Sequence, residues 1–162
     1  MSRLEIISWR SVRRILAILF LLTLAGCSPR PAAPQQTKSD PTTESWYPAA
    51  IRQLAAFNRD AEALFRSGKY DQAATIITNA QPVENRLLSA PHPTLAALEA
   101  SSDLDDLYGR MLLRNQQYGW ARTFFQKNVT RWKTWKPATP ETEQRWKQAV
   151  LALAECDRRL SE

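Results

Sequence analysis

The sequence is poor in the residues that build metal, disulfide and phosphate-binding sites. Its 162 residues include one histidine, two cysteines and four glycines. This supply cannot furnish a tetrahedral zinc site or a disulfide framework, and it leaves no glycine-rich phosphate loop. Catalysis is therefore the weakest expectation, and we expect no metal and no cofactor. The single His92 lies between two prolines, which is typical of a loop residue.

The first 27 residues have the order of an export signal. Four arginines between residues 3 and 14 precede an apolar run over 15–24, and the segment ends in Ala25-Gly26-Cys27. A helix that spans a bilayer needs about 20 apolar residues. The short run and the small residues after it therefore favour a cleaved signal peptide over a permanent span.

The four residues Leu24-Ala25-Gly26-Cys27 resemble the lipobox of bacterial lipoproteins. The resemblance implies that residues 1–26 are removed and that Cys27 carries a diacylglycerol, with a further acyl chain such as palmitate on its new amino group. One acyl chain binds a membrane only marginally, but two or more anchor a protein stably. Ser28 in place of Asp favours the periplasmic face of the outer membrane. The alternatives are an ordinary secretory peptide and an apolar N-terminal helix of a cytosolic protein.

Half of the basic surplus belongs to the predicted signal peptide. The chain has 22 Lys+Arg against 16 Asp+Glu, and residues 1–26 hold four Arg and one Glu. Without them, 18 basic and 15 acidic residues remain, so the surplus falls from +6 to +3. We therefore expect no nucleic-acid partner. Because Cys27 would be lipidated, Cys156 would be the only free thiol, and we expect it to be buried and inert.

Residues 27–47 are typical of a disordered tether. Four prolines occur between residues 28 and 46, and almost nothing apolar precedes Trp46, so this segment cannot form a core. A proline-rich spacer rises about 3.1 Å per residue, which gives a reach of up to about 60 Å. The predicted organisation is a signal peptide over 1–26, a tether over 27–47 and a helical domain over 48–162.

Apolar residues at steps of three and four predict helices from Pro48 onward. We expect one helix that Gly68 ends and a second helix from about Asp71 that Pro82 ends, with room for a short helix over 83–88. No segment predicts a strand.

The segment 94–114 predicts either one helix or two. Ser101-Ser102 could interrupt it, and Ser102 with Asp105 would make a variant capping box. A helix start at this point would explain a nearby acidic cluster, because the helix dipole favours negative charge there. The cluster consists of Asp103, Asp105 and Asp106.

The C-terminal third interleaves tryptophans with basic residues, over 131–136 and 145–147. An apolar stripe over 118–135 predicts one helix, and Thr139-Pro140 predicts the start of the last one. We expect the three tryptophans to pack between these helices, with the stems of basic residues covering the rings. A membrane-interface contact or an aromatic hot spot for a protein partner is the alternative.

Two stretches of the body, 61–73 and 109–121, align without gaps. Each has a small residue, a tyrosine nine positions later and an alanine three positions after that, namely Ala61, Tyr70 and Ala73, and Gly109, Tyr118 and Ala121. Ile77 and Phe125 also match. The pattern resembles the tetratricopeptide repeat, in which small residues let two helices approach closely.

The sequence departs from this repeat at three positions and in its period. Phe57 and Asp105 stand where the repeat usually has tryptophan, and Asn128 stands where it has a small residue. Tyr70 and Tyr118 are 48 residues apart, whereas the repeat has about 34. The predicted fold is all-α, with antiparallel hairpins stacked as a short tetratricopeptide-like array of two or three hairpins and a C-terminal capping helix. A generic helical bundle is the alternative.

The resemblance implies that the first helix of each hairpin lines a concave binding groove. The outward positions on these helices are Asn58, Glu62, Phe65, Arg66, Asp106, Arg110, Leu113 and Arg114. Some such grooves clamp a partner's C-terminal carboxylate with a lysine and an asparagine, but the matching positions hold Asn58 and Glu62. We therefore do not expect carboxylate clamping. The alternative for each residue is an ordinary solvated position.

These features favour a membrane-anchored lipoprotein that serves as a protein–protein adaptor or scaffold in the bacterial cell envelope, and not an enzyme. Its partner would be another envelope protein of an assembly, secretion or pilus machine. The alternative is an envelope enzyme or small-ligand-binding lipoprotein on a helical bundle, with carboxylates as reacting groups. A structural lipoprotein without a specific partner is a third reading. A closed acidic pocket would favour the enzyme, and an open concave face would favour the adaptor.

Overall fold

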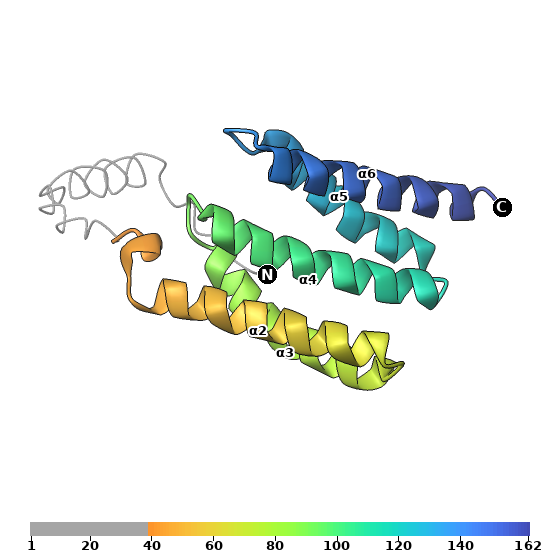
Figure 1. Ribbon diagram of the computed structural model, residues 1–162, viewed down its shortest axis with the longest axis horizontal. Coiled ribbons are helices and arrows are strands. Elements are labelled where there is room, and N and C mark those ends of the chain that lie inside the picture. Colours follow the sequence, from red (N-terminus) through yellow and green to blue (C-terminus); the bar gives the residue numbers. More distant parts are fainter. Residues whose placement is uncertain (1–38) are drawn as a thin grey trace, which may run out of the picture. The chain divides into compact units, whose positions relative to one another are not determined.

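The computed structural model describes residues 39–162, which form an all-α body without a strand (Figure 1). Its elements are the short 3-10 helix η1 (Pro41–Thr43) and the α-helices α2 (Trp46–Arg66), α3 (Tyr70–Leu88), α4 (Leu95–Arg114), α5 (Tyr118–Thr134) and α6 (Pro140–Leu160). The all-α prediction is confirmed. The predicted signal peptide, Cys27 and most of the predicted tether lie outside the described residues.

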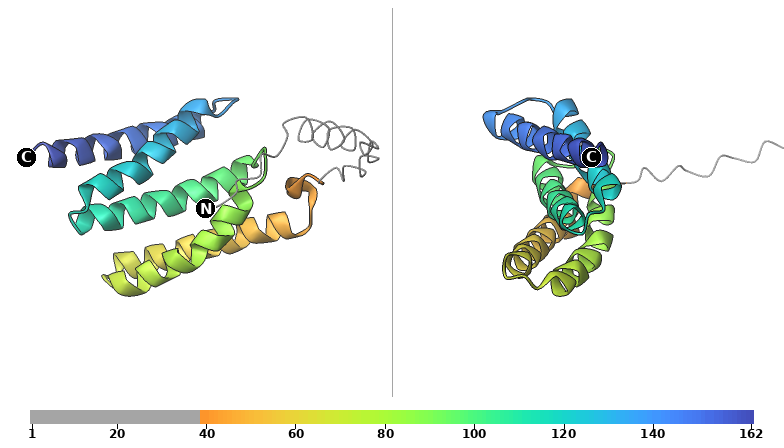
Figure 2. Two further views of the ribbon diagram at one scale, coloured as in Figure 1. Left: turned by 180° about the vertical axis from the view of Figure 1, so that it is seen from behind. Right: turned by 90° about the vertical axis from the view of Figure 1, so that its right-hand side faces the viewer.

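The helices form antiparallel neighbours in two layers. Helix α2 packs on α3, α4 packs on α5, and α6 packs on α5, while α2 and α4 also contact each other. Helices α2, α4 and α6 lie toward the viewer in Figure 1, and α3 and α5 come to the front when the body is seen from behind in Figure 2. One face of the body is therefore built from α2, α4 and α6.

The two hairpins α2–α3 and α4–α5 have the same turn geometry. Gly68 has φ 78° and Gln116, at the matching position, has φ 60°. The amide of the next residue then donates to the carbonyl oxygen five residues back, at 2.9 Å from Lys69 and 2.8 Å from Gln117. The backbone thus repeats where the two stretches of sequence align, although only the first turn has the glycine that favours a positive φ.

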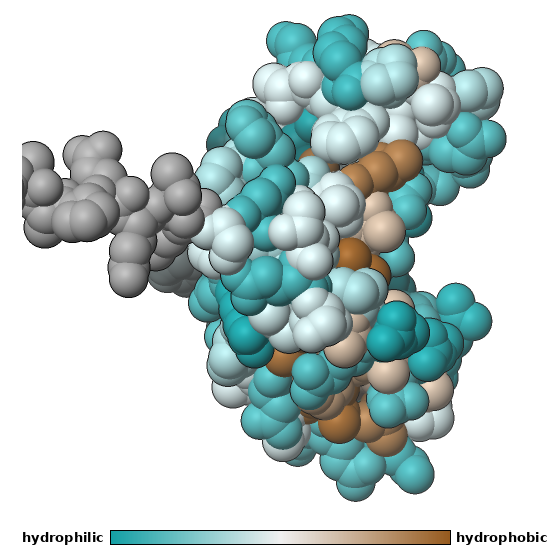
Figure 3. Space-filling model, turned by 90° about the vertical axis from the view of Figure 1, so that its left-hand side faces the viewer, coloured by the Kyte–Doolittle hydropathy of each residue, from teal (hydrophilic) through white to brown (hydrophobic). Residues whose placement is uncertain are grey.

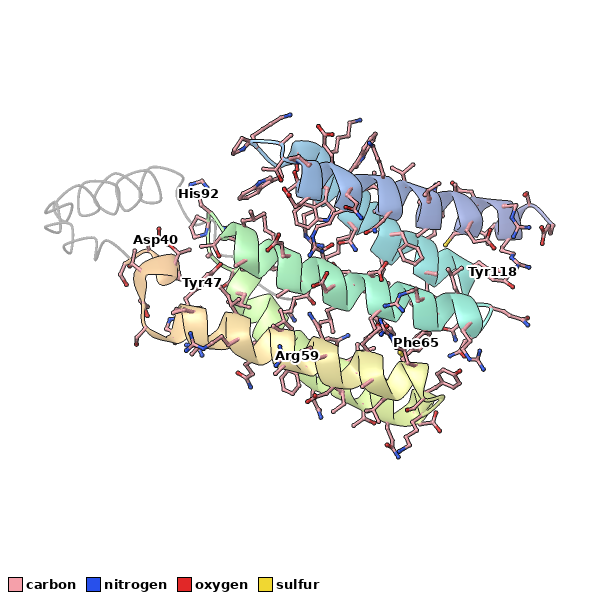
Figure 4. The ribbon with its side chains drawn as sticks, in the orientation of Figure 1. Asp40, Tyr47, Arg59, Phe65, His92 and Tyr118 are labelled. Carbon is pink, nitrogen blue, oxygen red and sulfur yellow. The ribbon has the colours of Figure 1, made fainter. Side chains whose placement is uncertain are left out.

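Tyr47 fixes the first turn of α2 to the loop between α3 and α4. Its ring is fully buried, and its hydroxyl donates to the Leu87 carbonyl at 3.4 Å and accepts from the Thr94 amide at 3.3 Å. Helix α2 therefore begins at Trp46, two residues before the expected domain start at 48. Tyr47 and His92 lie at the same end of the body, where the chain enters it (Figure 4).

The predicted helix break at Pro82 is wrong, and the segment 94–114, for which one helix or two was expected, is one helix. Pro82 lies inside α3, which continues to Leu88 because Glu84 and Leu87 are buried against the rest of the body and hold the last turns in place. Ser101 and Ser102 do not interrupt α4 but are buried in its middle. The predicted start of the last helix is confirmed, with Thr139 accepting from the amide of Thr142 in a capping box.

Candidate interaction groove

Four of the predicted groove residues meet between α2 and α4. Arg110 donates from Nη2 to Glu62 Oε2 at 2.6 Å and from Nε to Asp106 Oδ2 at 2.8 Å. Arg66 donates from Nε to the other oxygen of Glu62, Oε1, at 2.8 Å. Matching positions of the two hairpins thus face each other, and Glu62 joins them through Arg110.

The guanidinium of Arg110 is the shared partner of two carboxylates with different environments. Its hydrogen bond to Glu62 is the main reason that the pKa of Glu62 lies below its ordinary value. Burial raises the pKa of Asp106, although Arg110 opposes that rise. Because both carboxylates engage Arg110, this guanidinium has little capacity left for the carboxylate of a partner.

The other predicted residues contribute to packing as much as to the surface. Asn58 donates from Nδ2 to the Ala100 carbonyl at 2.7 Å and so ties α2 to α4, while its Oδ1 is buried without a partner among the described residues. Phe65 packs edge-on against Tyr70, with 5.5 Å between ring centroids. The Arg114 guanidinium lies 4.0 Å from the centroid of the same Tyr70 ring. Phe65 and Arg114 thus pack on Tyr70 at the turn end of the hairpins, while Asn58 joins α2 to α4 farther from the turns.

Pockets on both sides of α4 make this face a groove. One of about 280 Å³ lies between α2 and α4, another of about 310 Å³ lies between α4 and α6, and Asp103 and Asp106 line both. A third of about 380 Å³ at the turn end includes Leu113 and Arg114. Seen from the end where the chain enters, the outline of the body is indented between two lobes (Figure 3).

Helix α6 supplies a groove residue that the sequence did not reveal. Arg145 donates from Nη1 to Asp103 Oδ1 at 2.6 Å and approaches Glu99, so it bridges α6 and α4 beside the second pocket. In the sequence, Arg145 is one of two basic residues that flank Trp146, and nothing there marks it as a groove residue. We name the surface formed by the pockets on both sides of α4 the α2–α4–α6 groove.

A buried ionic network joins three helices on the other side of α4. Asp105 is 1% exposed and accepts from Lys127 at 2.9 Å and from Arg131 at 2.8 Å. Lys127 also donates to Glu84 at 3.2 Å, which brings α3 into the network. Burial, and then the charge of Asp105, raise the pKa of Glu84, while Lys127 opposes the rise. The dipole explanation of the acidic cluster is wrong, because Asp105 lies in the middle of α4.

Two of the three positional departures from the repeat pattern lie together at this network. Asn128 is buried, accepts from Arg131 and donates to the Ser102 carbonyl at 3.0 Å. Trp132 donates from Nε1 to Ser102 Oγ at 2.9 Å. Asp105 and Asn128, which stand where the repeat has apolar or small residues, are thus partners in one set of buried polar contacts. The fact that both positions depart from the repeat pattern is the sequence feature that could have indicated this network.

The three C-terminal tryptophans are buried to different degrees. Trp132 is 5% exposed, as expected for a ring between α5 and α6, but Trp135 and Trp146 are only partly buried. Together they line a pocket of about 360 Å³. The stretch is therefore more open than a packed core would be.

Within residues 39–162, no group of three or more His, Cys, Asp or Glu side chains could hold a metal ion. No helix in this range is long and apolar enough to cross a membrane. Cys156 is buried, as expected, and burial raises the pKa of its thiol. The chain matches no protein-family model, no curated protein and no solved structure in the comparisons with known proteins.

Proposed function

We propose that this protein is a lipoprotein of the bacterial cell envelope, anchored through Cys27, that acts as an adaptor or scaffold for another envelope protein. The anchor is supported by the order of four features in residues 1–47: the basic start, the short apolar run, the lipobox-like Leu24-Ala25-Gly26-Cys27 and the proline-rich segment. A lipid anchor and a tether would hold the helical body at the periplasmic face of the outer membrane while letting it reach its partner.

The α2–α4–α6 groove is the surface on which we propose that the partner binds. It is lined by acidic and basic side chains from three helices, and Glu62, Asp106 and Arg110 are already paired with one another. Charged groups that meet complementary charges of a partner across an interface give orientation and selectivity more than affinity. The groove therefore suits a polar segment of a protein partner, as in an assembly, secretion or pilus machine.

A site-specific cross-linking experiment tests this function. A photoreactive amino acid replaces Arg59, which is exposed and lines the groove, in the full-length protein expressed in a bacterial host. The matched control carries the same amino acid in place of Asn79, an exposed residue of α3. We expect an envelope protein to be cross-linked from position 59 and not from position 79. The same products from both positions, or none from either, would contradict the proposal.

A further inference from the structure

The pocket at the junction of α5 and α6, here named the tryptophan pocket, is lined by three indole rings and by polar side chains. Trp132, Trp135 and Trp146 line it, and the bond from Trp132 Nε1 to Ser102 fixes one wall. Aromatic walls with a few polar groups are typical of small-molecule sites, and indole rings favour a flat apolar group between them. The pocket shares no lining residue with the two pockets that flank α4.

The rim of the tryptophan pocket is basic. Lys133, Lys136 and Lys147 line it against one acid, Glu143. In the described part of the chain none of these lysines forms an ion pair, whereas the sequence neighbours Arg131 and Arg145 are paired with aspartates. Unpaired ammonium groups beside indole rings favour a ligand with an anionic group, because a charge-assisted hydrogen bond is stronger than a neutral one.

The size of the pocket limits its occupant. About 360 Å³ lies near the lower end of the roughly 300–1,000 Å³ typical of small-molecule sites. All lining residues come from 132–147, so the pocket is complete within one helix–loop–helix segment. A ligand of one or two rings fits this volume better than a long chain segment does.

The indole nitrogen of Trp146 is the one buried donor at this pocket without a partner among the described residues. An unpaired buried donor is energetically costly. A ligand oxygen that reached this N–H would satisfy it, and the new hydrogen bond would then favour the bound state.

We infer that the tryptophan pocket binds a small organic acid with a flat apolar ring. The ring lies between the indoles, the carboxylate lies at the lysine rim, and one carboxylate oxygen accepts from Trp146 Nε1. This ligand-binding role is additional to partner binding in the α2–α4–α6 groove and does not depend on it.

Calorimetric titration with a matched pair of probes tests the inference. Full-length protein, purified from the cellular fraction that carries it, is titrated with naphthoate and with its neutral amide, naphthamide, and the protein-free preparation serves as blank. We expect naphthoate to bind and naphthamide to bind about tenfold more weakly, because only naphthoate carries the charge. Equal binding of the two probes, or binding of neither, would overturn the inference.

Two variants separate the contributions of charge and hydrogen bond. Lys136→Gln removes one rim charge, and Trp146→Phe keeps a ring but removes the N–H. We expect each to weaken naphthoate binding by about fivefold to tenfold, while Lys136→Gln leaves naphthamide binding unchanged. Lys69→Gln and Trp120→Phe, at exposed positions away from the pocket, are the matched controls and should bind naphthoate as the wild type does.

Circular dichroism shows whether each variant is folded. Lys136 is exposed, so its substitution should leave the fold intact and decides the test even if Trp146→Phe does not fold. Unchanged naphthoate affinity in folded Lys136→Gln would overturn the inference, as would an equal loss in the Lys69→Gln control.

Discussion

The ring of Phe125 occupies the space that a side chain at Gly109 would need. A Cβ atom on Gly109 would lie 2.7 Å from both Cε1 and Cζ of Phe125, which is fully buried. The absence of a side chain at this position therefore lets α4 and α5 approach closely. In the first hairpin the matching pair is Ala61 and Ile77, both buried, so a smaller aliphatic side chain leaves room for one methyl group.

Gly109→Ala should lower the free energy of unfolding. Overpacking against a buried ring costs about 1–3 kcal/mol, which exceeds the gain of about 0.5–1 kcal/mol from replacing a glycine in a helix. The matched control is Gly119→Ala in α5, where a Cβ meets nothing within 4 Å and the helix gain should appear alone. Urea denaturation measures both. The packing account fails if the two substitutions change stability in the same direction.

Substitutions at the positive-φ positions of the two hairpin turns should change stability in opposite directions. Gln116→Gly should raise the free energy of unfolding by about 1 kcal/mol, because a non-glycine residue at positive φ is strained. Gly68→Ala should lower it by a similar amount for the same reason. Thermal melts of both variants measure the effects, and a stabilised Gly68→Ala would show that the two turns are not equivalent.

Asp105→Asn should be strongly destabilising. It leaves the buried Arg131 without its carboxylate, while the partly exposed Lys127 keeps Glu84. Removing one partner of a buried ionic pair costs about 3–5 kcal/mol. Asp60→Asn, at an exposed position of α2 without an ion pair among the described residues, is the control and should change stability by less than about 0.5 kcal/mol. Equal denaturation midpoints for the two variants would mean that the buried network contributes little.

Two glutamates should have opposite effects on the pH dependence of stability. Arg110 lowers the pKa of Glu62, so the ionised form of Glu62 stabilises the fold. This stabilisation is fully present above the ordinary glutamate pKa of about 4.3 and is lost as the pH falls through the lowered value. Burial raises the pKa of Glu84, so its ionised form costs stability at neutral pH, and this cost is relieved as the pH falls through the raised value.

Denaturation from pH 7 to pH 3 checks these signs against the variants Glu62→Gln and Glu84→Gln. As the pH falls, the difference in free energy of unfolding between wild type and Glu62→Gln should become smaller. Over the same range the free energy of unfolding of wild type should rise relative to that of Glu84→Gln. Differences that move in the same direction for both variants would contradict the assigned environments.

The helices were predictable where apolar spacing and caps agreed. Thr139-Pro140 marked the start of α6, and Gly68 marked the end of the first hairpin's leading helix. Pro82 misled because local propensity was overridden by burial of the residues that follow it. The sequence left open whether Ser101 interrupts the helix, and in the structure this serine is buried in the middle of α4. Tertiary packing of this kind cannot be read from a window of a single sequence.

The candidate sites were predictable only in part. The hairpin alignment placed positions 58–66 and 106–114 on matching helices, and the structure brings Glu62 and Arg110 together across 48 residues, a pairing that the alignment did not predict. Arg145 was missed because its contact with Asp103 depends on how α6 lies beside α4. The ionic network at Asp105 was missed because a buried charge and a solvated one look alike in sequence.

The most direct test of the lipid-anchored account compares the full-length wild-type chain with Cys27→Ala in a bacterial host, by membrane fractionation and intact mass. The account predicts that wild type is in the membrane fraction with the mass of residues 27–162 plus acyl chains, and that Cys27→Ala lacks the acyl mass and is not processed at residue 27. If both chains are soluble and uncleaved, Cys27 is not an anchor and the account is contradicted.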